Sequence, residues 1–200
     1  MRLSVPAIVL SLCAVFTAAS PTEVTIGDIT YAGSGCRAGS VAVAGNEFAV
    51  TLSFDSYTAS IGPNIPFTER RKNCNINFRL HYPQGYSFTV YKTNYIGIVK
   101  LEDGIKATQR AQSWFAGHPP PPPPPVISKW TGPVFETYNV TETFKKDDWV
   151  WSPCGAFTTL NVDTQIYLEN GVGHGSGYIT TDDIEHKAKT IFGIQWKKCP

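Results

Sequence analysis

Alternation of apolar and polar residues dominates this sequence. Every second residue is apolar in the run 75–82, and the same period relates Phe48, Val50, Leu52 and Phe54. A period of two places one face of a β-strand against a core and the other face in solvent. Both runs therefore predict half-buried strands.

Further apolar runs of similar length follow, and turn residues separate them. The runs contain Phe88 and Val90, then 95–101, then Leu160, Val162, Ile166 and Leu168, and finally Phe192, Ile194 and Trp196. Turns rich in Gly, Pro and Asn are expected at 83–85, 102–104, 169–171 and 173–177. The segment 105–115 is the nearest candidate for an amphipathic helix, but its composition suits a strand equally well. Many short strands with one wet face predict an all-β fold, an antiparallel sandwich of the jelly-roll kind.

The first nineteen residues have the pattern of a secretory signal peptide. Arg2 precedes an apolar run over 5–16, and small residues occupy 17–19. Such a run is too short to cross about 30 Å of hydrocarbon. We therefore expect cleavage after Ala19, export of the mature chain 20–200 as a single extracellular domain, and no contact with a membrane.

Export changes the interpretation of the cysteines. Removing Cys13 with the signal leaves four, namely Cys36, Cys74, Cys154 and Cys199. An even number in a secreted chain predicts a disulfide framework, and four cysteines allow three pairings. We favour Cys36 with Cys74 and Cys154 with Cys199, because each bridge then ties one half of the chain. Each closes a loop of about 40 residues, which contributes roughly 3 to 4 kcal/mol. The alternative, a zinc site, lacks the short ligand spacings that zinc favours.

The charge balance and one sequence motif narrow the partners. The chain has 17 basic residues, of which Arg2 leaves with the signal, against 16 acidic residues. This neutral balance predicts no attraction to nucleic acid. Asn139, followed by Val140 and Thr141, is an acceptor for N-linked sugar. We therefore expect a glycoprotein with this segment at its surface.

Seven consecutive prolines at 119–125 lie within an expected loop insertion at 117–131. Such a run forms an extended left-handed rod of about 22 Å. The functional interpretation is a docking rod for an aromatic groove, as cytosolic adaptor domains provide. Export removes those partners, so a stiff spacer in a surface loop is the favoured interpretation.

Several short motifs occur in a characteristic order along the chain. They include Gly33-Ser34-Gly35-Cys36, Phe54-Asp55-Ser56-Tyr57, Arg70-Arg71-Lys72-Asn73-Cys74, Pro83-Gln84-Gly85-Tyr86, Cys154-Gly155 and Trp196-Lys197-Lys198-Cys199. In this order the chain resembles the secreted fungal and bacterial family known as domain of unknown function 4360. The resemblance covers nearly all of the mature chain; it implies a fungal-type secreted protein with four cysteines and implies no activity. The chain departs from the family pattern in its prolines and in Arg37, where proline is expected.

The glycine-rich segment 173–177 invites a catalytic interpretation, because it contains His174 and Ser176. A nucleophile elbow requires glycine where His174 stands, and it requires a strand-to-helix turn. A phosphate cradle requires a following helix and usually a lysine. A turn between strands is therefore the favoured interpretation, and we expect no catalytic residues here.

Acidic residues follow this turn. Asp182, Asp183 and Glu185, together with Asp55 or Asp163, are candidates for a glycosidase carboxylate pair or a calcium site. The family resemblance implies an acidic stretch here, which favours calcium at Asp182 and Asp183 over catalysis. A solvated acidic turn without any cofactor is the simplest interpretation.

Trp149 and Trp151 are two residues apart. In a strand both rings would project from one face about 7 Å apart, near the spacing of sugar rings in a glycan. With Trp130 they are the candidate glycan-binding residues. Burial of these rings in the sandwich core is nevertheless the favoured interpretation, because tryptophans bury a large apolar area. The basic run Glu69-Arg70-Arg71-Lys72 is expected to be a solvated loop.

These patterns favour one functional hypothesis and leave two open. The favoured one is a secreted, non-enzymatic protein acting at the fungal cell wall or a host interface, with a cell-wall polysaccharide or a host extracellular protein as partner. A second is an extracellular hydrolase that uses carboxylates among Asp55, Asp163, Asp182, Asp183 and Glu185. A third is an effector or elicitor that a host recognises.

Overall fold

A computed structural model describes residues 20–21, 23–117, 124–155, 157–170, 175–181 and 188–200 of the chain. The expected signal peptide 1–19, most of the proline run and the acidic stretch 182–187 lie outside these residues. The described residues form twelve β-strands and the two short 3₁₀ helices η1 (Phe67–Arg70) and η2 (Lys146–Asp148).

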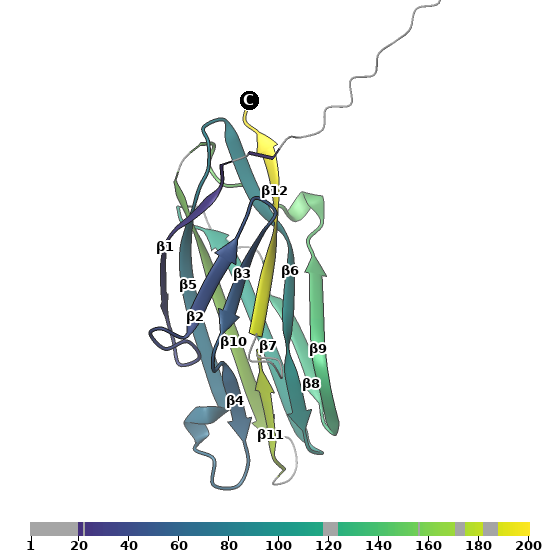
Figure 1. Ribbon diagram of the computed structural model, residues 1–200. Helices are drawn as coiled ribbons and strands as arrows, with labels where there is room; N and C mark the ends of the chain where they lie inside the picture. The colour runs from purple at the N-terminus through teal and green to yellow at the C-terminus, as the bar shows by residue number, and fades with distance from the viewer. Residues whose placement is uncertain (1–19, 22, 118–123, 156, 171–174, 182–187) are drawn as a thin grey trace, which may run out of the picture.

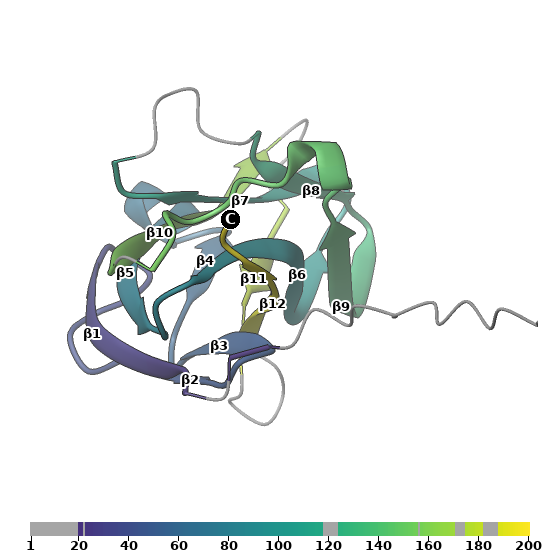
Figure 2. The ribbon, with the colours of Figure 1, turned by 90° about the horizontal axis from the view of Figure 1, so that it is seen from above.

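The strands form two sheets. The first has five strands in the spatial order β1 (Thr25–Ala32), β5 (Arg71–His81), β10 (Thr158–Asn170), β7 (Ile105–Phe115) and β8 (Val126–Thr131). The second follows the order β2 (Val41–Gly45), β3 (Ala49–Phe54), β12 (Ala188–Lys198), β6 (Tyr86–Leu101), β11 (Gly177–Thr180) and β4 (Thr58–Ile61), with β9 (Val134–Thr143) paired to β6. The strand pairs are antiparallel, and the sheets lie face to face in two layers (Figures 1 and 2). The predicted all-β antiparallel sandwich is therefore confirmed.

The core lies between the two layers and follows the alternation of the sequence. In β5 the side chains of Ile76, Phe78 and Leu80 are buried, whereas Asn75 and Arg79 are exposed. The helix candidate 105–115 is the strand β7, which lies between β10 and β8. Strand period therefore sets which face of each sheet is removed from water.

Two predictions of local structure are wrong. Phe48 is 60% exposed and precedes β3, because the Asn46 side chain accepts hydrogen bonds from the backbone N–H groups of Phe48 and Ala49 and forms a turn there. The expected loop 117–131 ends earlier, because residues 126–131 form β8 and pair with the edge of β7. Val126 and Trp130 pack against the core. Along β8 half-buried and exposed residues therefore alternate, as expected for a strand.

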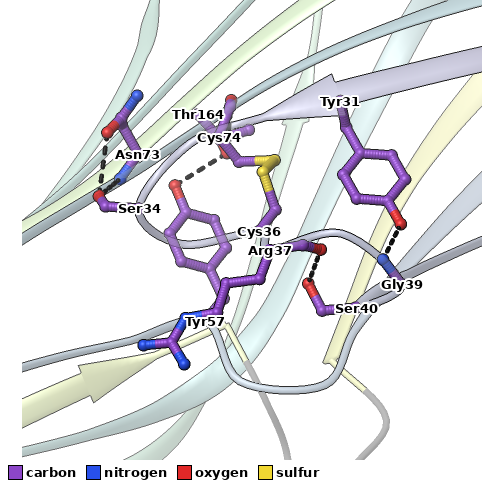
Figure 3. Close-up of a disulfide and its surroundings, with 10 residues drawn as sticks. All are labelled: Tyr31, Ser34, Cys36, Arg37, Gly39, Ser40, Tyr57, Asn73, Cys74 and Thr164. Carbon is purple, nitrogen blue, oxygen red and sulfur yellow. Dashed lines mark hydrogen bonds between the residues drawn. A yellow bond between two sulfur atoms is a disulfide. The ribbon is translucent and has the colours of Figure 1, made fainter.

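The two disulfides join Cys36 to Cys74 and Cys154 to Cys199, which is the favoured pairing; their Cα atoms lie 5.5 and 6.0 Å apart. The first joins the loop after β1 to β5. Figure 3 shows the ring of Tyr57 beside this bridge, with its hydroxyl 2.9 Å from the Thr164 hydroxyl. The second joins the segment before β10 to the end of β12. No helix in the described part of the chain is long and apolar enough to span a bilayer.

Candidate functional site

The segment between β9 and β10 carries two of the candidate tryptophans along the edge of β6. The backbone N–H groups of Phe144, Ser152 and Gly155 donate to the carbonyls of Tyr91, Phe88 and Tyr86, at 2.9, 2.8 and 2.9 Å respectively. Between the first two of these contacts the chain turns through η2 and loops away from the strand. Trp149 and Trp151 lie in this loop.

Four side chains meet there, and we call them the tryptophan cluster: Tyr91, Trp149, Trp151 and Lys197. The ring centroids of Trp149 and Trp151 are 5.9 Å apart, and Tyr91 lies 6.3 Å from Trp149. The Lys197 ammonium lies 4.3 Å from the centre of the Trp151 ring, a cation–π contact. The Trp149 indole N–H donates to the Phe144 carbonyl at 3.0 Å, which fixes the orientation of that ring.

The cluster is a surface feature. Trp149, Trp151 and Tyr91 are half-buried, and Lys197 is exposed. The core, as the described residues define it, contains Trp196 and packs against Trp130 but includes neither Trp149 nor Trp151. The favoured core interpretation of these two residues is therefore wrong, and part of each ring lies at the surface.

The expected flat row of rings is also wrong. Residues 149–151 are not in a strand, and the two indole planes meet at 68°. This edge-to-face contact is a favourable arrangement of two aromatic rings. The cluster therefore offers ring faces at an angle to each other instead of a plane.

Polar groups accompany the aromatic rings. Alternation along β12 places Gln195, which is half-buried, on the same face of that strand as Lys197. The Gln195 amide donates to the Trp196 carbonyl at 3.4 Å, so the Lys197 ammonium is the polar group that lies against an aromatic face of the cluster. An ammonium beside aromatic rings can donate hydrogen bonds to the hydroxyls of a ligand whose C–H groups stack on the rings.

Trp130 does not belong to this cluster. It lies in β8 of the other sheet, where its ring centroid is 4.8 Å from that of Tyr138. Its indole N–H donates to the Glu136 carboxylate at 3.0 Å. Trp130 therefore connects β8 to β9 and closes one side of the sandwich.

The sugar acceptor Asn139 lies in β9 and is exposed, opposite Ile96 of β6. Its position is compatible with a sugar, and glycosylation itself stays a prediction.

The candidate carboxylates do not form a site in the described part of the chain. Asp163 makes an ion pair with Arg110 at 2.9 Å, and Asp55 is exposed after β3. Asp182, Asp183 and Glu185 lie outside the described residues. Within those residues no group of three or more His, Cys, Asp and Glu side chains can hold a metal. The calcium site and the hydrolase therefore stay predictions.

The basic run is more ordered than a solvated loop. Glu69 and Arg70 lie in η1, and Arg71 and Lys72 begin β5. The ammonium of Lys72 pairs with the Glu69 carboxylate at 2.8 Å, and Lys72 is buried. Part of the basic run therefore has a structural role in η1, in β5 and in the Lys72–Glu69 ion pair.

Sequence reasoning missed Tyr91 and Lys197. One signal was present, because Trp151 and Lys197 each lie within three residues of a cysteine of the favoured Cys154–Cys199 bridge. A bridged pair brings its sequence neighbours together. Tyr91 has no comparable signal, since only strand pairing brings it to the cluster.

Comparison with known proteins identifies relatives of the chain. The model of a family described as domain of unknown function (DUF4360) matches residues 22–199. An uncharacterized secreted protein of the fungus Arthroderma benhamiae is 34% identical over 184 residues, which covers 91% of this chain and 74% of the relative. With this relative and the two disulfides, the predicted secretion is confirmed.

Two solved structures also show some similarity. TmCBM61 in complex with β-1,4-galactotriose matches with a TM-score of 0.28 and 11% identity, over 82% of this chain and 88% of that one. The enzymatically active domain of bacteriophage CBA120 tailspike protein 4 matches with a TM-score of 0.25 and 12% identity, over 86% and 19% of the two chains. These scores are too low to support any inference about the ligand of this chain.

Proposed function

The chain belongs to the secreted family described as domain of unknown function 4360, and for this member we propose extracellular glycan binding through the tryptophan cluster. In this proposal the protein is not an enzyme, and it acts at a cell wall or a host surface by holding a polysaccharide.

The observation that carries the proposal is the position of Trp149 and Trp151 at the surface of a sandwich whose core is already filled. Leaving large aromatic rings partly in water forgoes the free energy of burying them, which is about 25 cal/mol per Å². A ligand that covers the rings recovers that free energy. Sugar rings do so through their C–H faces, and the Lys197 ammonium can donate hydrogen bonds to their hydroxyls.

The angle between the rings selects among glycans. A crystalline polysaccharide surface is flat and contacts coplanar rings best, whereas planes at 68° suit a single chain that turns between them. We therefore propose that soluble or amorphous chains bind better than crystalline fibres.

Retention on polysaccharides tests the proposal. Purified protein is passed over chitin, β-glucan and plant cell-wall fractions, each in crystalline and amorphous form. Replacing both Trp149 and Trp151 by Ala is expected to weaken retention on the preferred fraction about tenfold, because buried aromatic contacts dominate interface energies. Phe157→Ala is the matched control, since it removes a 74% exposed aromatic ring elsewhere and is expected to leave retention unchanged.

Two results would count against the proposal. Retention by the double variant equal to that of the wild type would remove the cluster from the site. Release of reducing sugar from any fraction would instead favour the hydrolase. Repeating the assay with Asn139→Gln excludes competition from a sugar on the protein itself.

A further inference from the structure

A second binding feature lies at the lower end of the sandwich in Figure 1, where β4, β11, β6 and β9 run side by side. An open pocket of about 550 Å³ lies there, within the range of small-molecule sites. Its walls are mostly apolar and include Ile61, Ile65, Leu101, Pro133, Val134 and Phe135. It shares no residue with the tryptophan cluster.

The strand register arranges one row of this pocket. Tyr178 of β11 pairs with Lys100 of β6, and Lys100 pairs with Phe135 of β9. Side chains directly opposite each other on antiparallel strands share a face and interact. The Lys100 ammonium lies 5.7 Å from the centre of the Phe135 ring, which is 70% exposed. A cation therefore stands between two aromatic side chains at the rim of an apolar pocket.

The two charged residues of the pocket have different surroundings. The Glu102 carboxylate keeps its negative charge, and one of its oxygens accepts a hydrogen bond from the backbone N–H of Ser176 at 2.7 Å. Ion pairs among the described residues join Lys72 to Glu69 and Arg110 to Asp163, and neither involves Lys100. Within the described part of the chain the Lys100 ammonium therefore has no carboxylate partner, and it can pair with an anionic group of a ligand.

We infer that this pocket binds an amphiphile with an apolar body and an anionic carboxylate head. The apolar body lies against the Ile61, Leu101 and Val134 walls, where burial of its surface supplies most of the affinity. The carboxylate contacts the Lys100 ammonium at the rim, where both charges keep part of their hydration. The class of ligand is that of fatty acids and their relatives.

Three probes with the same tail separate the contributions of tail and head. Decanoate, decanol and decyltrimethylammonium are titrated calorimetrically into the full protein, the two ions below their micellar concentrations and decanol below its solubility limit. Decanoate is expected to bind with one-to-one stoichiometry and about fivefold more tightly than decanol, as a partly solvated ion pair allows. Decyltrimethylammonium is expected to bind more weakly than either.

Variants assign the site. Lys100→Gln is expected to abolish the preference for decanoate while leaving decanol binding unchanged, and Phe135→Ala to weaken all three probes. Both side chains are exposed, so the fold is expected to tolerate the changes. Lys129→Gln, an exposed lysine of β8, is the matched control and should change nothing. The double Trp149→Ala, Trp151→Ala variant should bind decanoate like the wild type.

Several results would overturn the inference. Among them are equal affinity for decanoate and decanol, an unchanged preference in Lys100→Gln, and absence of saturable decanoate binding. Binding only to phosphatidylcholine vesicles would indicate a membrane surface as the partner instead. A dimer by sedimentation that Phe135→Ala dissociates, without decanoate binding, would indicate a second copy of the chain.

Discussion

At the scale of single residues, the core contains three tyrosines whose rings are almost wholly removed from water. Tyr57 shares a hydrogen bond with Thr164, and the Tyr138 hydroxyl donates to the Thr180 carbonyl at 2.6 Å. Burial raises the pKa of Tyr57, Tyr95 and Tyr138 well above the ordinary value of 10.0, because the phenolate loses its hydration in the core. These hydroxyls therefore act as neutral hydrogen-bonding groups in the folded protein.

The raised pKa values predict a steep loss of stability in alkali. Above pH 10 the unfolded chain has released protons that the folded chain retains, so the free energy of unfolding falls as the pH rises. The stabilisation is complete below pH 10, and each buried tyrosine removes up to about 1.4 kcal/mol per pH unit above it. Urea unfolding between pH 7 and pH 11 measures this slope.

Tyrosinate absorbance provides the control for this experiment. Of the nine tyrosines in the chain, the three buried ones are expected to ionise only when the protein unfolds. Ionisation of all nine near pH 10 with an intact circular-dichroism spectrum would contradict the account.

At the scale of elements, the Cys154–Cys199 bridge supports the tryptophan cluster. It ties the segment that follows Trp151 to the end of β12, where Lys197 lies. The Cys36–Cys74 bridge instead ties the loop after β1 to β5, beside Tyr57 (Figure 3). The two bridges close loops of similar length, 45 and 38 residues, so they differ in position more than in their effect on the unfolded chain.

Removing each bridge separates these roles. The loop-entropy relation gives a loss of about 4 kcal/mol in the free energy of unfolding for either double Cys→Ser variant. Loss of Cys154–Cys199 is also expected to weaken polysaccharide retention and change tryptophan fluorescence, because the cluster loses its anchor. The double variant Cys36→Ser, Cys74→Ser is the control, measured at a temperature where both double variants remain folded. If the control weakens retention as much as loss of Cys154–Cys199 does, the proposed role of the second bridge is wrong.

At the scale of the whole molecule, the sequence predicted the layers better than the edges. Strands with one buried and one wet face, such as β5, have a clear period of two and were found. Strand β9 was missed because it is an edge strand whose residues, apart from Tyr138, are largely exposed, so its sequence has little alternation. The runs at 88–90 and 95–101 are one strand, β6, in which an irregularity opposite Gly193 interrupts the period.

The two candidate sites also differ in how far the sequence could predict them. Trp149 and Trp151 are visible as a pair, but the angle between their rings depends on a loop whose path is set by hydrogen bonds to β6. The pocket joins residues near positions 61, 101, 134 and 178, which only strand pairing brings together. No local pattern in the sequence predicts a site of this kind.

Nuclear magnetic resonance of the five tryptophan indole N–H groups tests glycan binding by the cluster most directly. Chitohexaose and laminarihexaose are titrated into ¹⁵N-labelled protein, with Trp149→Phe and Trp151→Phe used to assign the signals. We predict that the indole signals of Trp149 and Trp151 shift in a saturable manner with at least one oligosaccharide, while those of Trp130 and Trp196 do not. Saturable shifts confined to Trp130 or Trp196, or no shift with either oligosaccharide, would contradict the account.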